Sequence, residues 1–363
     1  MSFAQTESQM MLADLASKLL ATENDFEIRR HRLNATPPER LALWPSLAEQ
    51  GILGAAFPED SGGFGGTMLD LAVLMQVIGA RLVVEPVLAS AICGRVLLAA
   101  GDTEQLGSII AGERILAFAH TEGFDPFAPL GVTAIQSGDI FTLTGAKSAI
   151  RHADLAHGYI VSALYDGKPA CFLAEAGSTG LSVEAFRLID GSSAAMLNFN
   201  ATPARYLAGA DTLADALLWA QAGLAAEVTG ILDALNATTF AYLGTRKQFG
   251  VPLAAFQALQ HRAADMYAAA EEARVLTGRL IRAIDESSPV RFALASAAKS
   301  LTDEAGRKIG HEAVQLHGGM GVSDELNVSH YLKRLAAIRA EYGSADLHRT
   351  RFAELNEENA DAA

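Results

Sequence analysis

Apolar residues recur at helical spacing through the first third of the chain. They lie three and four positions apart, which puts one apolar stripe on a helix. Stretches with this spacing are residues 10–20, 41–53 and 68–110, with breaks at Pro37, Pro38, Pro86 and Gly101. Because proline and glycine interrupt helices, the pattern predicts several helices and an N-terminal helical domain over residues 1–115.

Short runs rich in β-branched and aromatic residues replace this pattern in the middle of the chain. The runs are residues 131–136, 140–144, 159–164, 170–174 and 196–199. Ser137-Gly138-Asp139 is a hairpin signal between the first two runs. Short strands with close turns are typical of an antiparallel sandwich or barrel, which we predict for residues 116–208.

Long helical patterns return after residue 208. They cover residues 213–245, 254–284 and 290–316, with breaks at 248–252 and 287–289. Long helices joined by short breaks indicate an antiparallel bundle, which we predict for residues 209–363. The fold class expected for the whole chain is α+β and mainly α, with a central β sandwich or barrel between two helical parts.

Composition excludes several classes of protein. Half of the 363 residues are hydrophobic and 19% are charged, which rules out a disordered chain. The net charge of −14 argues against nucleic-acid binding, because the phosphate backbone requires a basic face. Two cysteines, Cys93 and Cys171, are too few for a disulfide framework, and we expect both to be small buried side chains. The histidines lack metal-ligand spacing, so we expect no metal.

We also expect a cytoplasmic protein without a membrane span. Residues 1–13 do not have the basic and apolar regions of a signal peptide. The most apolar stretch, residues 213–232, contains Asp215 and Glu227. Charges inside a membrane-spanning helix are costly, so this stretch is predicted to be a buried helix of the bundle.

Two glycine-containing segments carry the candidate chemistry. They are Arg246-Lys247-Gln248-Phe249-Gly250-Val251-Pro252-Leu253 and Gln315-Leu316-His317-Gly318-Gly319-Met320-Gly321. An arginine at a helix end can bind a diphosphate through paired N–H donors, and a glycine-rich turn exposes backbone N–H groups. The alternative interpretation is a pair of helix C-caps. A third glycine-rich segment, residues 57–66, is interpreted as a turn because it fits neither nucleotide-binding fingerprint.

Together the two segments resemble the acyl-CoA dehydrogenase flavoprotein family. That family has an Arg-x-Gln/Thr-Phe-Gly-x-Pro-Leu segment and, about 65 residues later, a Gln-x-x-Gly-Gly-x-Gly segment. Further similarity lies in residues 44–63, in Phe256-Gln257, in Ala264-Asp265-Met266 and in Phe118-Ala119-His120-Thr121-Glu122. The resemblance extends over nearly the whole chain, and its helical–β–helical order agrees with the segmentation above.

The resemblance implies bound FAD, oxidation of an acyl-CoA thioester to a trans-2-enoyl-CoA, and electron transfer to an electron-transfer flavoprotein. In members of the family a carboxylate removes the α-proton. The residues that would clasp FAD across a subunit interface are Arg246, Gln248, Phe249, Gln257, Gln315, Leu316 and Gly319. His120 and Thr121 would contact the isoalloxazine from the β module.

The catalytic base is where the sequence departs from the family. In many members the glutamate lies in a Tyr-Glu-Gly-Thr segment, which here is Glu341-Tyr342-Gly343-Ser344. Tyr342 occupies the place of the glutamate, and Glu341 precedes it by one residue. Other members carry the glutamate on the helix before the arginine, near the position of Ala220 in this chain.

Glu227 is the second candidate base, because it lies almost two helical turns after Ala220 and therefore on nearly the same face. It is the single charged residue between Asp215 and Asp233. A buried, unpaired carboxylate has a raised pKa, which suits a general base. A Glu227 hydrogen-bonded to Thr229, Arg246 or a neighbouring helix is the structural alternative. A chain without a competent base of its own is the third.

Two further departures concern the flavin wall and a basic stripe. Members usually have a Trp after Gly-x-Lys, but Gly145-Ala146-Lys147 is followed by Ser148-Ala149-Ile150-Arg151. Ala149 then leaves a wider pocket or weaker FAD retention, and Arg151 adds a charge there or points to solvent. The stripe is expected to be a solvated helix face, with an approach to a phosphate of FAD or CoA as the alternative, and it comprises Lys333, Arg334, Arg339, Arg349 and Arg351.

The short chain and the altered motifs look similar to bacterial members that act on bulky or steroid side-chain acyl-CoAs. This resemblance implies a homotetramer, or an α2β2 heterotetramer with a paralogous subunit. Three functions follow as hypotheses. The chain is an acyl-CoA dehydrogenase, a non-catalytic FAD-clasping subunit of a heteromeric one, or a flavoenzyme of the same fold with different chemistry.

Overall fold

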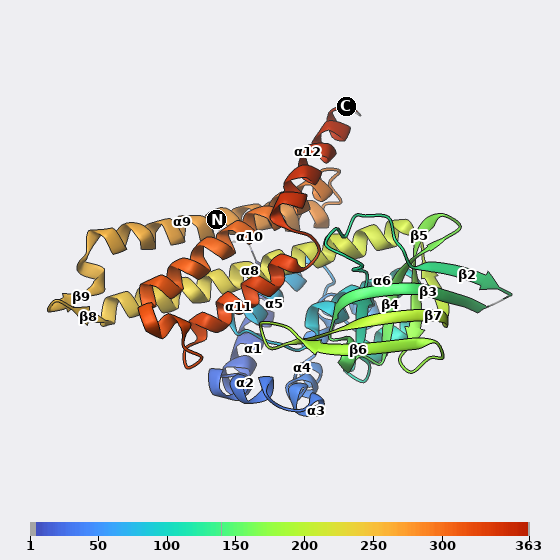
Figure 1. Ribbon diagram of the computed structural model, residues 1–363, viewed down its shortest axis with the longest axis horizontal. Helices are drawn as coiled ribbons and strands as arrows, with labels where there is room; N and C mark the ends of the chain where they lie inside the picture. The colour runs from blue at the N-terminus through green and yellow to red at the C-terminus, as the bar shows by residue number, and fades with distance from the viewer. Residues whose placement is uncertain (1–4, 139, 362–363) are drawn as a thin grey trace. The chain divides into compact units, whose positions relative to one another are not determined.

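The computed structural model describes residues 5–138 and 140–361, which form two compact units (Figure 1). The helical unit contains the described residues of Met1–Phe26, Ala72–Val83 and Gln221–Ala363. The barrel unit contains Glu27–Leu71 and Val84–Ala220. Each unit is therefore assembled from segments that are distant in sequence. The domain boundaries expected after residues 115 and 208 follow chain order instead, and they stay a prediction.

Three long helices dominate the helical unit and begin and end close to the predicted residues. They are α8 (Ala210–Thr245), α9 (Gln257–Asp285) and α10 (Arg291–His317). The other helices of this unit are α1 (Glu7–Glu23), most of α5 (Met68–Ala80), α11 (Asn327–Ala340) and α12 (Ala345–Asp361). No helix in the described ranges is long and apolar enough to cross a bilayer.

A close helix crossing lies inside the helical unit, between α5 and α8. A Cβ atom on Gly79 would stand 2.1 Å from the carbonyl oxygen of Glu227, and one on Gly230 would stand 2.0 Å from that of Gln76. Only glycine permits backbones to approach so closely. The crossing fixes the turn of α8 that carries Glu227 in the interior of the unit.

The barrel unit combines short helices with the strands. Its helices are α2 (Phe26–Leu33, from its second residue), α3 (Pro37–Arg40), α4 (Trp44–Glu49), α6 (Val87–Ala99) and α7 (Thr103–Ile110), together with the start of α5 and of α8. Its strands are β1 (Leu116–Ala119), β2 (Thr133–Ser137), β3 (Ile140–Arg151), β4 (Gly158–Tyr165), β5 (Lys168–Glu175), β6 (Leu181–Arg187) and β7 (Ser193–Ala208).

The strand pairings confirm the predicted barrel, with a mixed sheet in place of a purely antiparallel one. They run in a closed ring through β4, β2, β3, β7 and β5, while β1 is added beside β4 and β6 beside β7. β1 and β2 both pair with β4 in parallel, and the other pairings are antiparallel. Ser137 pairs with Ile140, as the hairpin signal predicts, although Asp139 lies outside the described residues.

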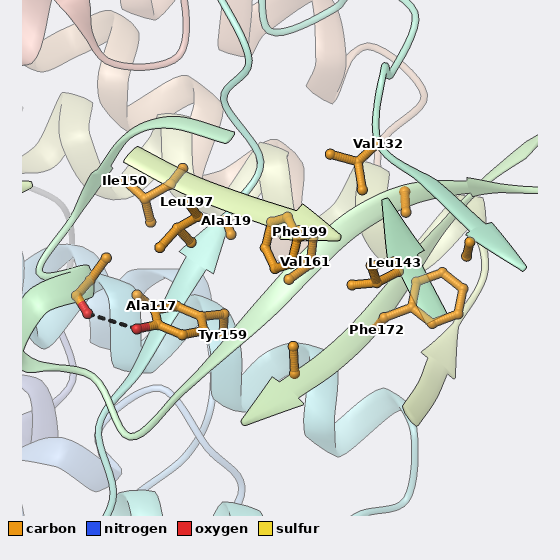
Figure 2. Close-up of a cluster of buried hydrophobic side chains, with 14 of the residues drawn as sticks. Ala117, Ala119, Val132, Leu143, Ile150, Tyr159, Val161, Phe172, Leu197 and Phe199 are labelled. Carbon is orange, nitrogen blue, oxygen red and sulfur yellow. Dashed lines mark hydrogen bonds between the residues drawn. The ribbon is translucent and has the colours of Figure 1, made fainter. Parts of the chain in front are cut away.

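The inner face of the barrel forms a continuous apolar core (Figure 2). Leu143, Phe172 and Leu197 project into it from different strands and are fully buried. Tyr159 is buried as well, and its hydroxyl donates a hydrogen bond to the carbonyl oxygen of Ala153 at 3.1 Å, so its polar end is satisfied. Cys93 and Cys171 are buried free thiols, which confirms the prediction for both.

Candidate functional site

The first glycine-containing segment forms a small hairpin where α8 ends. β8 (Lys247–Gln248) pairs with β9 (Val251–Pro252) in antiparallel register. The turn between them consists of Phe249 and Gly250, which both have positive φ angles, of 53° and 84°. Figure 1 shows this hairpin at the free ends of α8 and α9. The left-handed backbone explains the glycine. The exposed ring of Phe249 lies edge-on to that of Phe256, the residue before α9, with centroids 6.2 Å apart.

The second segment lies at the end of α10 and is joined to the first by an aromatic stack. After His317 the chain continues as a short 3-10 helix, η5 (Gly318–Val322). The ring of Tyr242, in the last turn of α8, stacks on the ring of His317 with centroids 4.3 Å apart. The Tyr242 hydroxyl also donates to the His317 carbonyl oxygen at 3.5 Å. The two predicted cofactor-binding segments therefore meet at one end of the helical unit.

Four polar side chains at this end of the helical unit make no hydrogen bonds within the described chain. Arg246, Gln248, Gln257 and Gln315 are exposed, and their side chains make no hydrogen bond to any residue of the described ranges. Phe249 is 92% exposed. A guanidinium group, amides and bare backbone are the donors that a diphosphate requires, so the residues present fit FAD.

Gly319 and Leu316, the other two predicted FAD-binding residues of the second segment, differ in what they expose to a ligand. No atom lies within 4 Å of the place where a Cβ atom on Gly319 would stand, so the backbone there is open to a ligand. Leu316 is buried, and its side chain packs within the unit. Only the backbone of Leu316 can therefore reach a cofactor at this surface.

His120 follows β1 in the barrel unit, and its ring belongs to the interior. It is 4% exposed, with Nδ1 at 2.9 Å from the Ser162 hydroxyl and Nε2 at 2.8 Å from the Pro126 carbonyl oxygen. Because a carbonyl only accepts, Nε2 carries the hydrogen and Nδ1 accepts from Ser162. Burial and the charge of Lys147 lower the pKa of His120 to about 4. The predicted contact of His120 with FAD stays a prediction, and its ring nitrogens are already occupied.

Lys147 is the central polar residue of this region, and the sequence analysis gave it no role. Its ammonium group is fully buried and donates to the His120 carbonyl oxygen at 3.1 Å, to Glu122 at 2.6 Å and to the Ser162 hydroxyl at 2.9 Å. Burial lowers the pKa of Lys147 to about 8. These three bonds fasten the segment after β1 to β3 and β4. A lysine is almost never fully buried unless it is paired, and the sequence pattern of β3, which also contains Thr142, Thr144 and Ser148, does not mark this one as buried.

Thr121 lies beside the position where the family has its tryptophan. The Thr121 carbonyl oxygen accepts from the Ser148 N–H at 2.8 Å. Ala149 follows at a bulge of β3, exposed and with a φ angle of 53°. Arg151 turns to the buried carboxylate of Asp190, with Nη1 3.3 Å from the nearer oxygen, and thus does not point freely to solvent. A cavity of about 430 Å³ is lined by residues of the segment from His120 to Leu130, without Thr121 and Phe127.

The two candidate bases meet at one arginine. Glu227 is 3% exposed and accepts from Arg334 Nε at 2.5 Å and from Nη2 at 2.8 Å. Arg334 Nη1 donates to Glu341, which ends α11, at 2.9 Å. The expectation of an unpaired Glu227 is therefore wrong, and the alternative of a partner on a neighbouring helix is confirmed. The sequence could not show this pairing, because 107 residues separate its members.

Arg334 also corrects the interpretation of the basic stripe as a solvated face. It is buried, whereas Lys333 pairs with the exposed Asp324 at 3.2 Å and Arg349 pairs with Glu304 and Asp346 at the surface. The stripe thus divides into one interior cation and several surface ones. Tyr342, at the position of the family's glutamate, has a φ angle of 54°, and its carbonyl oxygen accepts from His348.

Comparison with known proteins identifies relatives along the chain. Residues 6–111 match the profile described as acyl-CoA dehydrogenase, N-terminal domain, and residues 208–355 match that of the C-terminal domain. Acyl-CoA dehydrogenase FadE27 of Mycobacterium tuberculosis is 29% identical over 363 residues, with 94% of each chain covered.

Two solved structures have the same fold over almost their full length. A variant of the Tcur3481-Tcur3483 steroid ACAD is 30% identical, with a TM-score of 0.93, 98% of this chain covered and 99% of that one. The ChsE4-ChsE5 complex of Mycobacterium tuberculosis contains a chain 26% identical, with a TM-score of 0.92 and 99% of both chains covered. Both names denote assemblies of two different proteins.

Proposed function

Because this chain belongs to the acyl-CoA dehydrogenase family, whose members are FAD oxidoreductases, we propose that it works in the α,β-dehydrogenation of a bulky acyl-CoA thioester to its trans-2-enoyl-CoA. The observation that carries the proposal is the stack of Tyr242 on His317. It gathers the exposed donors of two distant segments at one end of the helical unit. Uncommitted donors at a glycine-rich turn suit an anionic cofactor.

In this proposal the chain's own residues bind and orient the cofactor. Arg246 holds the diphosphate with its planar fork of N–H donors, and the amides of Gln248 and Gln315 add further hydrogen bonds. FAD, when bound, supplies the acceptor for the hydride that leaves the β-carbon. The protein has to supply a carboxylate for the α-proton, and it has to keep water from the reacting atoms.

An assembly with other chains completes this site. Phe249 is 92% exposed on the hairpin that follows Arg246, so its ring is accessible to a neighbouring chain beside the donors proposed for FAD. We therefore propose a homotetramer or an α2β2 heterotetramer in which this hairpin covers cofactor held by a neighbouring subunit. The names of the similar structures support a heteromeric, steroid-linked assembly. An electron-transfer flavoprotein is the proposed electron acceptor.

A second role within the same reaction is favoured by the pairing of Glu227 and Glu341 with Arg334. Both oxygens of Glu227 accept hydrogen bonds from the buried guanidinium of Arg334, so neither oxygen is left to take a proton from a substrate. The chain then serves as an FAD-clasping subunit, and the base comes from a paralogous chain. Of the two roles, this geometry favours the clasping subunit.

The visible spectrum of the purified chain tests the proposal. We expect little flavin in the chain expressed alone, and stoichiometric FAD that bleaches with an acyl-CoA after co-expression with a paralogous subunit. Stoichiometric FAD that bleaches in the chain alone would instead identify a self-sufficient enzyme. A preparation that never retains flavin, alone or co-expressed, contradicts the proposal as a whole.

A further inference from the structure

The outward side of α9 carries exposed residues at spacings of three and four. They begin at Ala268 and continue with Glu272, Val275, Arg279 and Arg282. This spacing places them in one line along the helix, and it is also the spacing at which contact residues recur in packed helices. The opposite side of α9 is buried and packs on α10. We call these five residues the α9 stripe, and no element of the described chain covers it.

Val275 lies at the centre of the α9 stripe and is 50% exposed. It belongs to a shallow hollow of about 400 Å³ that is lined by Glu271, Glu272, Val275, Leu276 and Arg279. The hollow has an apolar centre, with acidic side chains toward the start of α9 and a basic one toward its end. An apolar centre inside a polar rim is the usual arrangement of a protein–protein contact. A second helix laid along the stripe would bury the valine and leave the charges at the edge.

The two charges that flank Val275 are not paired within the described chain. Glu272 and Arg279 form no ion pair or hydrogen bond with any residue of the described ranges. The positions three and four residues away from each of them hold no opposite charge, so neither has a partner along the helix. By contrast, Arg274 points toward the interior of the unit and pairs with Asp233 of α8 at 2.9 Å. The charges of α9 that face the unit are thus paired, and those of the stripe are available to another chain.

A twofold axis at Val275 would pair these charges with each other. When two identical helices meet antiparallel, the residues before the axis on one helix face those after the axis on the other. Glu272 of one copy then faces Arg279 of the second copy, and symmetry forms the same pair again. The two Val275 side chains meet between the pairs. A helix of different sequence would need both charges at matching positions, whereas a second copy supplies them.

We propose that the α9 stripe is the contact with a second copy of this chain, packed antiparallel around Val275 and closed at both ends by Glu272–Arg279 pairs between the copies. The inference rests on the proposed function in one respect, that both proposed tetramers contain two copies of the chain. It adds the surface that joins them. In an α2β2 assembly the paralogous subunits then bind to other surfaces of the chain.

Crosslinking of a Val275→Cys variant tests the position of the axis. A disulfide forms only where the two Cα atoms lie within about 7 Å. Diamide oxidises the two thiols to the disulfide and is itself reduced to the hydrazine, with transfer of two electrons and two protons. We expect a crosslinked species with the mass of two copies of the chain, which a reductant separates again. The native Cys93 and Cys171 are buried, so the new thiol is the accessible one.

Ala268→Cys is the matched control, because Ala268 is exposed on the same stripe but lies two turns before the axis. Its two copies would be about 21 Å apart along the helix pair, at 1.5 Å per residue, and should not crosslink. Both variants are oxidised in the chain alone and in the complex co-expressed with a paralogous subunit. The intact mass of the product distinguishes two joined copies from a copy joined to the paralogous subunit.

Charge reversal tests the pairs at the two ends of the contact. Glu272→Arg and Arg279→Glu each place like charges opposite one another, and symmetry repeats the repulsion. We expect either change to weaken the association of two copies about tenfold, measured on dilution by analytical ultracentrifugation. The double variant restores both pairs and should associate like the wild type. Arg282→Glu alters the net charge as much as Arg279→Glu does, but it faces Ala268 of the second copy and should have no effect.

Three results would overturn the inference. The first is a Val275→Cys variant that does not crosslink, or that crosslinks to the paralogous subunit. The second is an Ala268→Cys variant that crosslinks as completely as Val275→Cys. The third is a pair of single reversals that leave the association unchanged, or a double reversal that does not recover it. Flavin content separates these failures from that of the proposed function. A preparation that retains FAD without the crosslink refutes the contact alone, and a crosslinked preparation that never retains FAD refutes the function alone.

Discussion

The ring of Tyr242 lies against the ring of His317, with centroids 4.3 Å apart and planes inclined by 25°. Tyr242 is four residues before Arg246, and His317 is two residues after Gln315. A single aromatic contact thus brings the ends of α8 and α10 together. The donors proposed for FAD depend on this contact for their spacing.

Replacement of Tyr242 by leucine should therefore weaken cofactor retention. Leucine keeps apolar surface but loses the stack, which is worth about 0.5–1.5 kcal/mol. In the complex co-expressed with a paralogous subunit, we expect a lower flavin-to-protein ratio after gel filtration and a small decrease in melting temperature. Tyr267→Leu on the exposed face of α9 is the matched control and should retain the wild-type ratio. Equal flavin content in both variants would contradict a role for the stack.

Replacement of Arg246 by lysine tests whether FAD binding depends on the positive charge of this residue or on its paired N–H donors. Lysine keeps the positive charge but cannot donate two parallel hydrogen bonds. We expect FAD to dissociate about ten- to a hundredfold more readily, which corresponds to a loss of about 1.5–3 kcal/mol. Unfolding should be unchanged, because the Arg246 side chain is exposed and makes no hydrogen bond within the described chain. Arg282→Lys, at an exposed position of α9, is the control for fluorescence-monitored flavin release.

His120 should make the chain less stable in acid. Its pKa is lowered to about 4 by burial and by Lys147, whereas an unfolded histidine takes a proton near pH 6.5. Between these values the unfolded chain binds the additional proton, so stability is lost as the pH falls from about 6.5 to 4. The difference in unfolding free energy between the wild type and His120→Gln should shrink by about 3 kcal/mol over this window. Urea titrations at several pH values measure it, with His311→Gln as an exposed control.

Glu85 should make the stability of the folded chain depend on pH with the opposite sign. Burial raises the pKa of Glu85 to about 7 although Arg32 lies 3.6 Å away. The folded carboxyl holds its proton up to that pH, whereas the unfolded one loses it near 4.5, so stability falls as the pH rises from 4.5 to 7. Glu85→Gln mimics the protonated form and should be more stable than the wild type above pH 7, by about 3 kcal/mol. A wild type that gains stability over this variant with rising pH would refute the assignment.

The helices were predicted more accurately than the strands, for a physical reason. Residues 254–284 and 290–316 carry long, periodic apolar stripes that end at proline- or glycine-containing breaks, and α9 and α10 begin and end within three residues of these bounds. β1 was not predicted because all four of its residues are buried, which removes the alternation that marks a strand. β6 was missed although Leu181-Ser182-Val183-Glu184 alternates, and six of its seven residues are exposed in the structure.

The sequence by itself determined the fold class, the family and the residue types of the cofactor-binding segments. These properties reside in local patterns, where apolar periodicity and the backbone freedom of glycine act within a few residues. The tertiary structure alone decided which charges face each other. Glu227 looked like an unpaired base and Arg334 like a surface cation, because the energy of a buried charge depends on its spatial neighbours. Only the packing of α11 against α8 made the two residues partners.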